Sequence, residues 1–127
     1  MKKGIFDGIL LLTDFDGTIA ERAVISDKNR LAVEYFISEG GLFSLATGRF
    51  PDVLGLEGFT VKPNTYCVML NGALLWAPGA GVVDRRPLDT ADAREFTEAL
   101  LAECPERRLF GLHTEERYIP CHVGEEY

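Results

Sequence analysis

The stretch that decides the fold is Leu11-Leu12-Thr13-Asp14-Phe15-Asp16-Gly17-Thr18. Its apolar start continues the run 9–12, which predicts a short buried strand. Residues i and i+2 of a strand point to the same side, so Asp14 and Asp16 should leave the strand end facing the same way. The Gly-Thr pair that follows them supplies the turn.

Two interpretations of this aspartate pair stay open. Like charges this close together are costly unless a cation lies between them or one carboxylate holds a proton. Because open α/β sheets bind ligands at the carboxyl ends of their strands, the pair indicates a ligand site. The alternative is a polar turn that happens to contain two aspartates, since Asp and Gly are common turn residues.

A helix and a second strand follow the turn and complete a strand–helix–strand unit with the first strand. Ser26 is a good N-cap for a helix over residues 27–39, and glycines at 40 and 41 end it. The helical spacing predicts a buried face made of Leu31, Ala32, Tyr35 and Phe36. Residues 42–46 then form a second buried strand. The crossover is long enough for a helix, so the two strands should be parallel.

Polar residues also stop the second and third strands. Thr47, Gly48 and Arg49 offer a hydroxyl, an open backbone amide and a guanidinium, which are groups suited to a phosphoryl oxygen. A third apolar strand over 66–70 ends at Asn71, which we expect on the same edge of the sheet. Asn-Gly is also a strong signal for a hairpin turn. Asn71 can belong to such a turn and face a ligand at the same time.

The pattern changes after about residue 77. A turn and a short extended piece lead to a helix over about 90–103, and two strands follow at 107–113 and 117–122. Antiparallel strands with one helix replace the parallel arrangement. We therefore expect a core region over 1–78 and a second region over 79–127.

Composition and charge limit the class of protein. The chain has 127 residues and a net charge of −7, which argues against nucleic acid or an anionic membrane as a partner. It contains no apolar run of about 18 residues, so the sequence predicts no membrane-spanning helix. Its cysteines number three and lack metal-ligand spacing, which suits reduced thiols in the cytoplasm. Cys67, inside an apolar run, should be a core residue.

Three motifs, in this order, resemble the signatures of one family. Residues 14–18, Asp-Phe-Asp-Gly-Thr, resemble the first signature of the haloacid dehalogenase-like (HAD) superfamily of phosphatases and phosphotransferases. Residues 46–49, Ala-Thr-Gly-Arg, are similar to the second signature in its Cof-type branch, and 70–73, Leu-Asn-Gly-Ala, resemble the third landmark of that branch. The resemblance implies an α/β fold: a partial Rossmann-like parallel sheet, made of the first three strands of a HAD-like core, followed by the start of an α+β cap.

The resemblance also implies roles for the site residues. Asp14 would be the nucleophile that takes the phosphoryl group as an aspartyl phosphate, and Asp16 would be the general acid and then the base. Mg²⁺ would bind the Asp14 carboxylate and the Asp16 backbone carbonyl. The substrate would be a small phosphorylated metabolite such as a sugar phosphate. The residues that contact it would be Gly17, Thr18, Thr47, Gly48, Arg49 and Asn71.

The family also uses a lysine and a Gly-Asp-x-x-x-Asp-like acidic pair that follow the cap. The lysines of this chain are Lys2, Lys3, Lys28 and Lys62, all ahead of the cap region. The resemblance therefore implies a truncated enzyme. Two hypotheses stay open: an Mg²⁺-dependent phosphatase of Cof type, or an inactive fragment or homologue that serves as a binding or assembly module.

The resemblance has a consequence for the first strand as well. In this superfamily, later strands of the core lie beside it, and without them it becomes an edge of the sheet. A bare apolar edge is a template for pairing with another chain. We expect self-association through this edge or through the apolar face of the cap.

Overall fold

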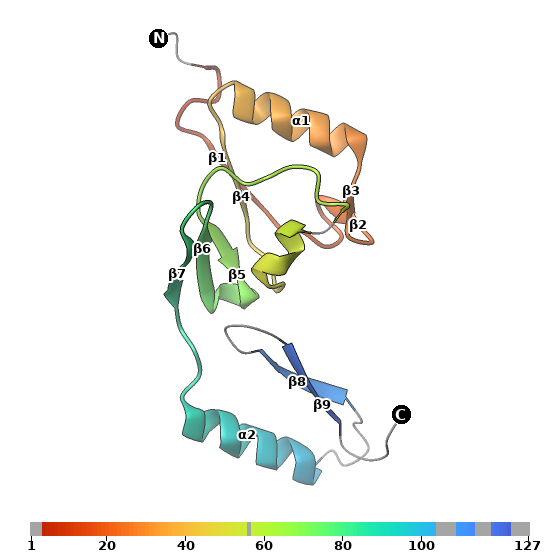
Figure 1. The fold of residues 1–127 in the computed structure, drawn as a ribbon, viewed down its shortest axis with the longest axis vertical. Coiled ribbons are helices and arrows are strands. Elements are labelled where there is room, and N and C mark those ends of the chain that lie inside the picture. The colour runs from red at the N-terminus through yellow and green to blue at the C-terminus, as the bar shows by residue number, and fades with distance from the viewer. Residues whose placement is uncertain (1–3, 56, 104–108, 114–117, 123–127) are drawn as a thin grey trace. The chain divides into compact units, whose positions relative to one another are not determined.

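The structure is a computed structural model that describes residues 4–55, 57–103, 109–113 and 118–122. Its contacts divide the chain into two units, Met1–Pro87 and Leu88–Tyr127. Figure 1 shows the elements in chain order. Among the described residues, no helix combines the length and the apolar character that a membrane span requires.

The first unit holds most of the secondary structure. Its elements are β1 (Leu10–Thr13), β2 (Ala20–Glu21), β3 (Val24–Ile25), α1 (Asp27–Ser38), β4 (Leu42–Leu45), the 3-10 turn η1 (Pro51–Gly55), β5 (Cys67–Met69), the 3-10 turn η2 (Leu70–Gly72), β6 (Leu74–Ala77) and β7 (Gly81–Arg85). The predicted order of strand, helix and strand is confirmed, and the structure adds the short β2–β3 hairpin ahead of the helix.

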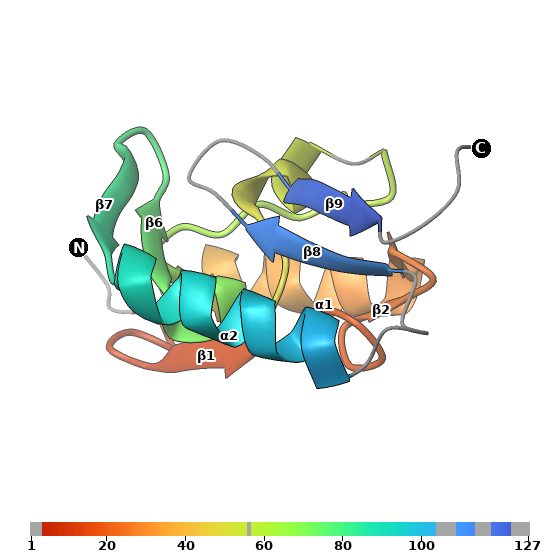
Figure 2. The ribbon, with the colours of Figure 1, turned by 90° about the horizontal axis from the view of Figure 1, so that it is seen from below.

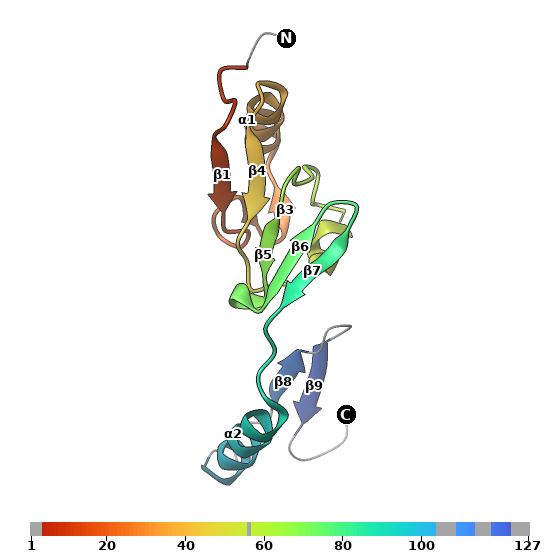
Figure 3. The same ribbon diagram turned by 90° about the vertical axis from the view of Figure 1, so that its left-hand side faces the viewer.

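Three parallel strands form the centre of this unit. β1 pairs with β4 in parallel, with Leu10 opposite Leu42 and Thr13 opposite Leu45. A parallel bridge between Ala46 and Val68 then joins the end of β4 to β5. Figure 3 shows β1, β4 and β5 side by side, followed by the antiparallel strands β6 and β7. The predicted α/β fold with a parallel sheet is confirmed, and it brings the three strand ends to one edge.

Local signals explain where α1 begins and ends. The Ser26 side chain accepts a hydrogen bond from the Asn29 amide at 3.2 Å, which caps the first turn. At the other end, Gly40 has φ +89° and its amide bonds to the Ile37 carbonyl at 3.0 Å. Both helix limits follow from residue types that the sequence displays.

The predicted buried face of α1 is wrong. Leu31 and Tyr35 are 56% and 54% exposed, whereas Val33 is buried and Ile37 packs against the core. Apolar residues lie on two faces of this helix, and the sheet covers the face that carries Val33. The helical period alone does not say which of two apolar faces meets the sheet.

The core of the first unit lies around β4 and β5. Its largest fully buried side chains are those of Phe15, Phe43, Leu45, Met69, Val53, Cys67 and Ser44. The prediction that Cys67 is a core residue is confirmed. The prediction of a buried first strand is wrong, because Leu10, Leu11 and Leu12 are 55%, 37% and 50% exposed. Among the described residues, β1 has a strand neighbour on one side only.

The second unit contains α2 (Thr90–Glu103) and the antiparallel strands β8 (Leu109–His113) and β9 (Tyr118–His122). Figure 2 shows β8 and β9 running in opposite directions. The predicted helix and strand pair are confirmed, while the turn predicted between the strands lies outside the described residues. β7 pairs with β6 and so belongs to the first unit. The predicted division into a core region over 1–78 and a cap region over 79–127 stays a prediction.

Candidate functional site

The turn after β1 presents its two aspartates to solvent. Phe15 is fully buried between Asp14 and Asp16, both of which are exposed. The Phe15 ring packs against Phe59, with 5.4 Å between the ring centroids. This alternation agrees with the prediction that the two carboxylates face the same way. The buried ring fixes the turn that carries them.

Backbone hydrogen bonds close the turn. The Gly17 amide donates to the Ala20 carbonyl at 2.9 Å, and the Ala20 amide donates to the Phe15 carbonyl at 2.9 Å. Gly17 has φ +74°, a conformation that favours glycine. The Thr18 hydroxyl lies 3.5 Å from Asp14 Oδ2, where it donates a long hydrogen bond. Thr18 thus contacts the predicted nucleophile.

Arg49 holds the carboxylate of Asp16. Its Nε donates to Asp16 Oδ2 at 2.7 Å and its Nη2 donates to Asp16 Oδ1 at 2.8 Å, so both oxygens are engaged. The guanidinium carbon lies 5.4 Å from the centre of the Phe15 ring. This bidentate pair connects the end of β4 to the end of β1. Arg49 was predicted as a substrate contact, and in this structure it contacts a second predicted site residue.

The electrostatics of this pair follow from its geometry. The hydrogen bonds to Asp16 raise the pKa of the Arg49 guanidinium above its ordinary value, and burial works against them. The charges of Asp16 and Asp52 add to the increase. Both side chains of the pair stay open to solvent, at 40% for Arg49 and 48% for Asp16. Arg49 is therefore a permanent cation at the site, held where an anionic ligand can reach it.

Thr47 lies at the buried end of the site. It is 5% exposed, and its amide donates to the Val68 carbonyl at 3.0 Å. Its hydroxyl oxygen accepts from the Arg49 amide at 3.2 Å. These bonds fix the backbone that follows β4.

Asn71 meets the same segment from β5. Its amide donates to the Thr47 carbonyl at 3.2 Å, and the Leu70 amide donates to the Arg49 carbonyl at 3.3 Å. A Cβ added at Gly48 would lie 2.9 Å from Asn71 Oδ1, so only glycine fits there without a shift. Leu70 and Asn71 have φ +51° and +54°, in the left-handed region. The structure thus brings Thr47, Gly48, Arg49 and Asn71 together, as the sequence predicted.

The oxygen atoms at the end of β1 suit a hard cation. The bridge between Asp16 and Ala20 uses the Gly17 amide and the Phe15 carbonyl, and so leaves the Asp16 carbonyl outside it. The Asp14 carboxylate and this carbonyl are both oxygen donors, the kind of ligand that Mg²⁺ prefers. Within the described part of the chain, no group of three or more His, Cys, Asp or Glu residues could hold a metal ion. In chemical kind, the two oxygen donors at the end of β1 fit a magnesium ion.

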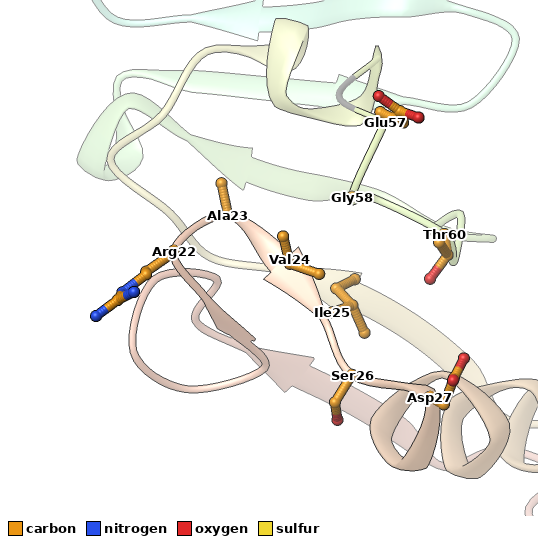
Figure 4. A pocket seen from close by; sticks show the side chains of 9 residues that line it. All are labelled: Arg22, Ala23, Val24, Ile25, Ser26, Asp27, Glu57, Gly58 and Thr60. Atoms are coloured by element: carbon orange, nitrogen blue, oxygen red, sulfur yellow. The ribbon is translucent and has the colours of Figure 1, made fainter.

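Two hollows lie beside the β2–β3 hairpin. Figure 4 shows the larger, of about 780 Å³, which is lined by residues 22–27 together with Glu57, Gly58 and Thr60. Gly58 packs so closely on the hairpin that an added Cβ would lie 2.6 Å from the Ala23 carbonyl oxygen. The smaller hollow, of about 420 Å³, has Gly17 and Thr18 in its wall. The carboxylates of Asp14 and Asp16 line neither hollow.

Sequence reasoning missed three residues that shape the site. Phe15 and Phe59 anchor the aspartate turn, and Asp52 acts on the charge of Arg49. Phe15 lies inside the motif, so the alternation of exposed and buried positions could have identified it. Phe59 acts on Phe15 across a chain separation for which the sequence offers no local signal, whereas Asp52 lies three residues after Arg49, close enough in the sequence to be considered.

Comparisons with known proteins support the same arrangement. The sequence profile of haloacid dehalogenase-like hydrolases matches residues 11–120. No protein with a curated description matches the chain. Among solved structures, a haloacid dehalogenase-like hydrolase from B. subtilis aligns with a TM-score of 0.73 and 22% identity, over 86% of this chain and 38% of that one.

Two further structures have the same fold. The phosphatase BT1666 from Bacteroides thetaiotaomicron has a TM-score of 0.70 and 22% identity, over 93% of this chain and 43% of its own. The HAD subclass IIB sugar phosphatase BT4131 has a TM-score of 0.66 and 21% identity, over 87% of this chain and 42% of its own. The chain thus spans less than half the length of each of these proteins.

Proposed function

The chain belongs to the haloacid dehalogenase-like hydrolases, and on that premise we propose that it serves phosphate-monoester hydrolysis of the Cof type, with Asp14 as nucleophile. The observation that carries the proposal is the contact set at the strand ends. Asp14 is exposed beside the Thr18 hydroxyl, and Asp16 is held by Arg49 from the neighbouring strand. A carboxylate nucleophile divides a difficult hydrolysis into two easier steps.

In the first step, an Asp14 oxygen attacks phosphorus and the bond from phosphorus to the leaving alcohol breaks. Asp16, in its protonated form, gives a proton to the alcohol oxygen. In the second step, water attacks the aspartyl phosphate while the Asp16 carboxylate takes its proton. Inorganic phosphate leaves, and both aspartates return to their starting forms.

Mg²⁺ would be held by the Asp14 carboxylate and the Asp16 carbonyl, where it would offset the repulsion between nucleophile and phosphate. The substrate class is a small phosphorylated metabolite, such as a sugar phosphate. Two of the structural neighbours are described as a phosphatase and a sugar phosphatase, which supports this class.

Arg49 has a defined task in this proposal. Both oxygens of Asp16 accept hydrogen bonds from it, so Asp16 cannot turn an oxygen toward the leaving group while both bonds remain. A phosphoryl oxygen is a competing acceptor for the same guanidinium. When the substrate binds, Arg49 transfers a hydrogen bond to it and releases one oxygen of Asp16, which takes up from solvent the proton that it then gives to the leaving alcohol.

The experiment is turnover of p-nitrophenyl phosphate with Mg²⁺ by the chain and by Asp14→Asn. We expect the substitution to lower kcat by about a thousandfold or more, because it removes the nucleophile. Asp84→Asn, in β7 and 61% exposed, is the matched control and should keep full activity. Equal turnover by the chain and by Asp14→Asn would overturn the proposal.

The second candidate function is a phosphate-binding or assembly module without turnover. It is favoured by the lack, among the described residues, of an acidic cluster that could complete the metal site. A folded chain that binds inorganic phosphate but does not hydrolyse the ester would support this second candidate. An Arg49→Gln variant would then lose phosphate binding, because the cation is removed.

A further inference from the structure

The side chain of Phe15 lies between the core and the charged part of the candidate site. Its ring is fully buried, and the Phe59 ring packs against it with 5.4 Å between the centroids. The guanidinium carbon of Arg49 lies over the same ring, also at 5.4 Å from its centre. An aliphatic side chain would fill the core as well, but an aromatic ring also offers a negative face to a cation. The ring thus has a second contact that core packing does not require.

Two backbone hydrogen bonds fix where the side chain of Arg49 begins. The Arg49 amide donates to Thr47 Oγ1 at 3.2 Å, and the Arg49 carbonyl accepts from the Leu70 amide at 3.3 Å. The long stem of an arginine has many rotamers, so these bonds do not decide where the guanidinium lies. Its position is set by what it meets at the end of β1, namely the Asp16 carboxylate and the Phe15 ring.

These two partners hold Arg49 in different ways. The carboxylate attracts the guanidinium through its charge, which it loses when it takes up a proton. In the proposed reaction Asp16 has to release an oxygen and hold a proton, so its attraction for Arg49 weakens while the substrate is bound. The Phe15 ring has no titratable group, and arginine stays charged, so the attraction between these two does not change at that step.

We propose that Phe15 is a positioning residue for Arg49: its ring holds the guanidinium at the end of β1 whether or not Asp16 is charged. The cation then stays where the phosphoryl group binds while Asp16 transfers its proton. What the held cation does for catalysis rests on the proposed function. The hold itself is a property of the folded chain, and it can be measured without turnover.

Nuclear magnetic resonance on Asp16→Asn tests the hold directly, because this variant has no charged partner at position 16. Nuclear Overhauser contacts between the Hδ protons of Arg49 and the Phe15 ring should persist in it. The Nε–H group of Arg49 should also stay ordered on the ps–ns timescale, as measured by nitrogen relaxation.

Arg30 is the matched control for this measurement. Its guanidinium forms ion pairs with Asp27 and Glu34 on α1, at 3.3 and 2.9 Å. When both acids are neutralised, by Asp27→Asn with Glu34→Gln, the Nε–H group of Arg30 should become mobile. The comparison shows how an arginine of this chain behaves once its charged partners are removed.

A fluorinated phenylalanine in place of Phe15 separates the charge distribution of the ring from its size. Fluorine draws electron density from the ring face, which weakens the attraction for a cation but keeps a ring of nearly the same shape in the core. In the Asp16→Asn background this replacement should lower the order of the Arg49 Nε–H group. With Asp16 present, the two hydrogen bonds of the ion pair should keep that group ordered. The same replacement at Phe59 is the matched control, because Phe59 belongs to the same aromatic pair while Phe15 makes the contact with the guanidinium.

Inorganic phosphate is the probe for the consequence at the site. Fluorination at Phe15 should weaken phosphate binding by about two- to fivefold, as measured by calorimetry, because the cation is no longer held in place before the anion arrives. Fluorination at Phe59 should leave the affinity for phosphate unchanged.

The inference is overturned if Asp16→Asn lacks the contacts between Arg49 and the Phe15 ring, a result that requires no change at position 15. It is also overturned if fluorination at Phe15 and at Phe59 has equal effects on the order of Arg49 or on the affinity for phosphate. A chain whose Arg49 depends on the ring but which hydrolyses no phosphate ester would support the inference and contradict the proposed function.

Discussion

β1 and β4 have the same length and lie side by side, yet they have opposite surroundings. Phe43 and Leu45 of β4 are fully buried, and Ser44 between them is 1% exposed. Leu10 and Leu12 of β1 are half exposed, although they are as apolar as their neighbours. Within the described part of the chain the two strands differ in their strand neighbours, because β4 has β1 on one side and β5 on the other, whereas β1 pairs with β4 alone.

The difference continues past the strand ends into the candidate site. Thr47, which follows β4, is 5% exposed and is tied to β5 through Val68. Asp14 and Asp16, which follow β1, are exposed, and Asp16 is held by one arginine. The site therefore has a buried half that is fixed by the sheet and an open half that is fixed by a turn and one ion pair.

The largest expected effect tests the contrast in burial. Phe43 and Leu11 are partners in the β1–β4 register. Phe43→Ala should lower the free energy of unfolding by about 3–5 kcal/mol, because it leaves a cavity in the core. Leu11→Ala should cost below about 2 kcal/mol, since its side chain is partly exposed in the folded chain. Urea unfolding measures both losses of free energy, and equal losses would contradict the contrast in burial.

The sequence predicts the elements of this fold better than their burial. Ser26 and Gly40 mark the limits of α1 through local chemistry that any helix end requires. The apolar run 9–12 correctly predicts a strand. Whether that strand is buried depends on which other segments pack beside it, and the run itself carries no information on that. The face of α1 that carries Leu31 was assigned wrongly for a related reason, because burial of a helix face is decided by what it packs against.

The sequence likewise predicts some features of the candidate site and not others. That Asp16, Thr47 and Asn71 meet at one edge follows from the parallel strands that the sequence predicts. The ion pair of Arg49 with Asp16 does not follow, because 33 residues separate them and a long side chain has many rotamers. The left-handed backbone of Leu70 has no sequence signal either, since leucine rarely adopts it.

A second prediction sharpens the account of the buried half of the site. Gly48→Ala should destabilise the chain by about 1 kcal/mol, because the new Cβ would lie 2.9 Å from Asn71 Oδ1 and the exposed Asn71 side chain would have to turn away from it. Asn71→Gly removes the obstructing amide at a position with φ +54°, which glycine adopts readily. The double variant should therefore recover most of the loss, as measured in a double-mutant cycle by urea unfolding. Additive losses would show that the segments after β4 and β5 are not coupled through this contact.

The smallest expected effect concerns the link between the two halves. Arg49→Lys keeps the charge but cannot form the bidentate pair with Asp16. Both partners are well exposed, so the substitution should cost below about 1 kcal/mol of unfolding free energy, and less as salt is raised.

Arg30→Lys is the matched control for this prediction, because Arg30 makes a similar pair with Glu34 on α1, at 2.9 Å. The two variants should lose similar, small amounts of stability in urea. They should differ in the turnover of a phosphate ester, which Arg49→Lys should lower by about tenfold or more because Asp16 and the phosphoryl group lose a planar donor. A loss of several kcal/mol for Arg49→Lys alone would mean that the ion pair is structural, and the open half of the site would then be as fixed as the buried half.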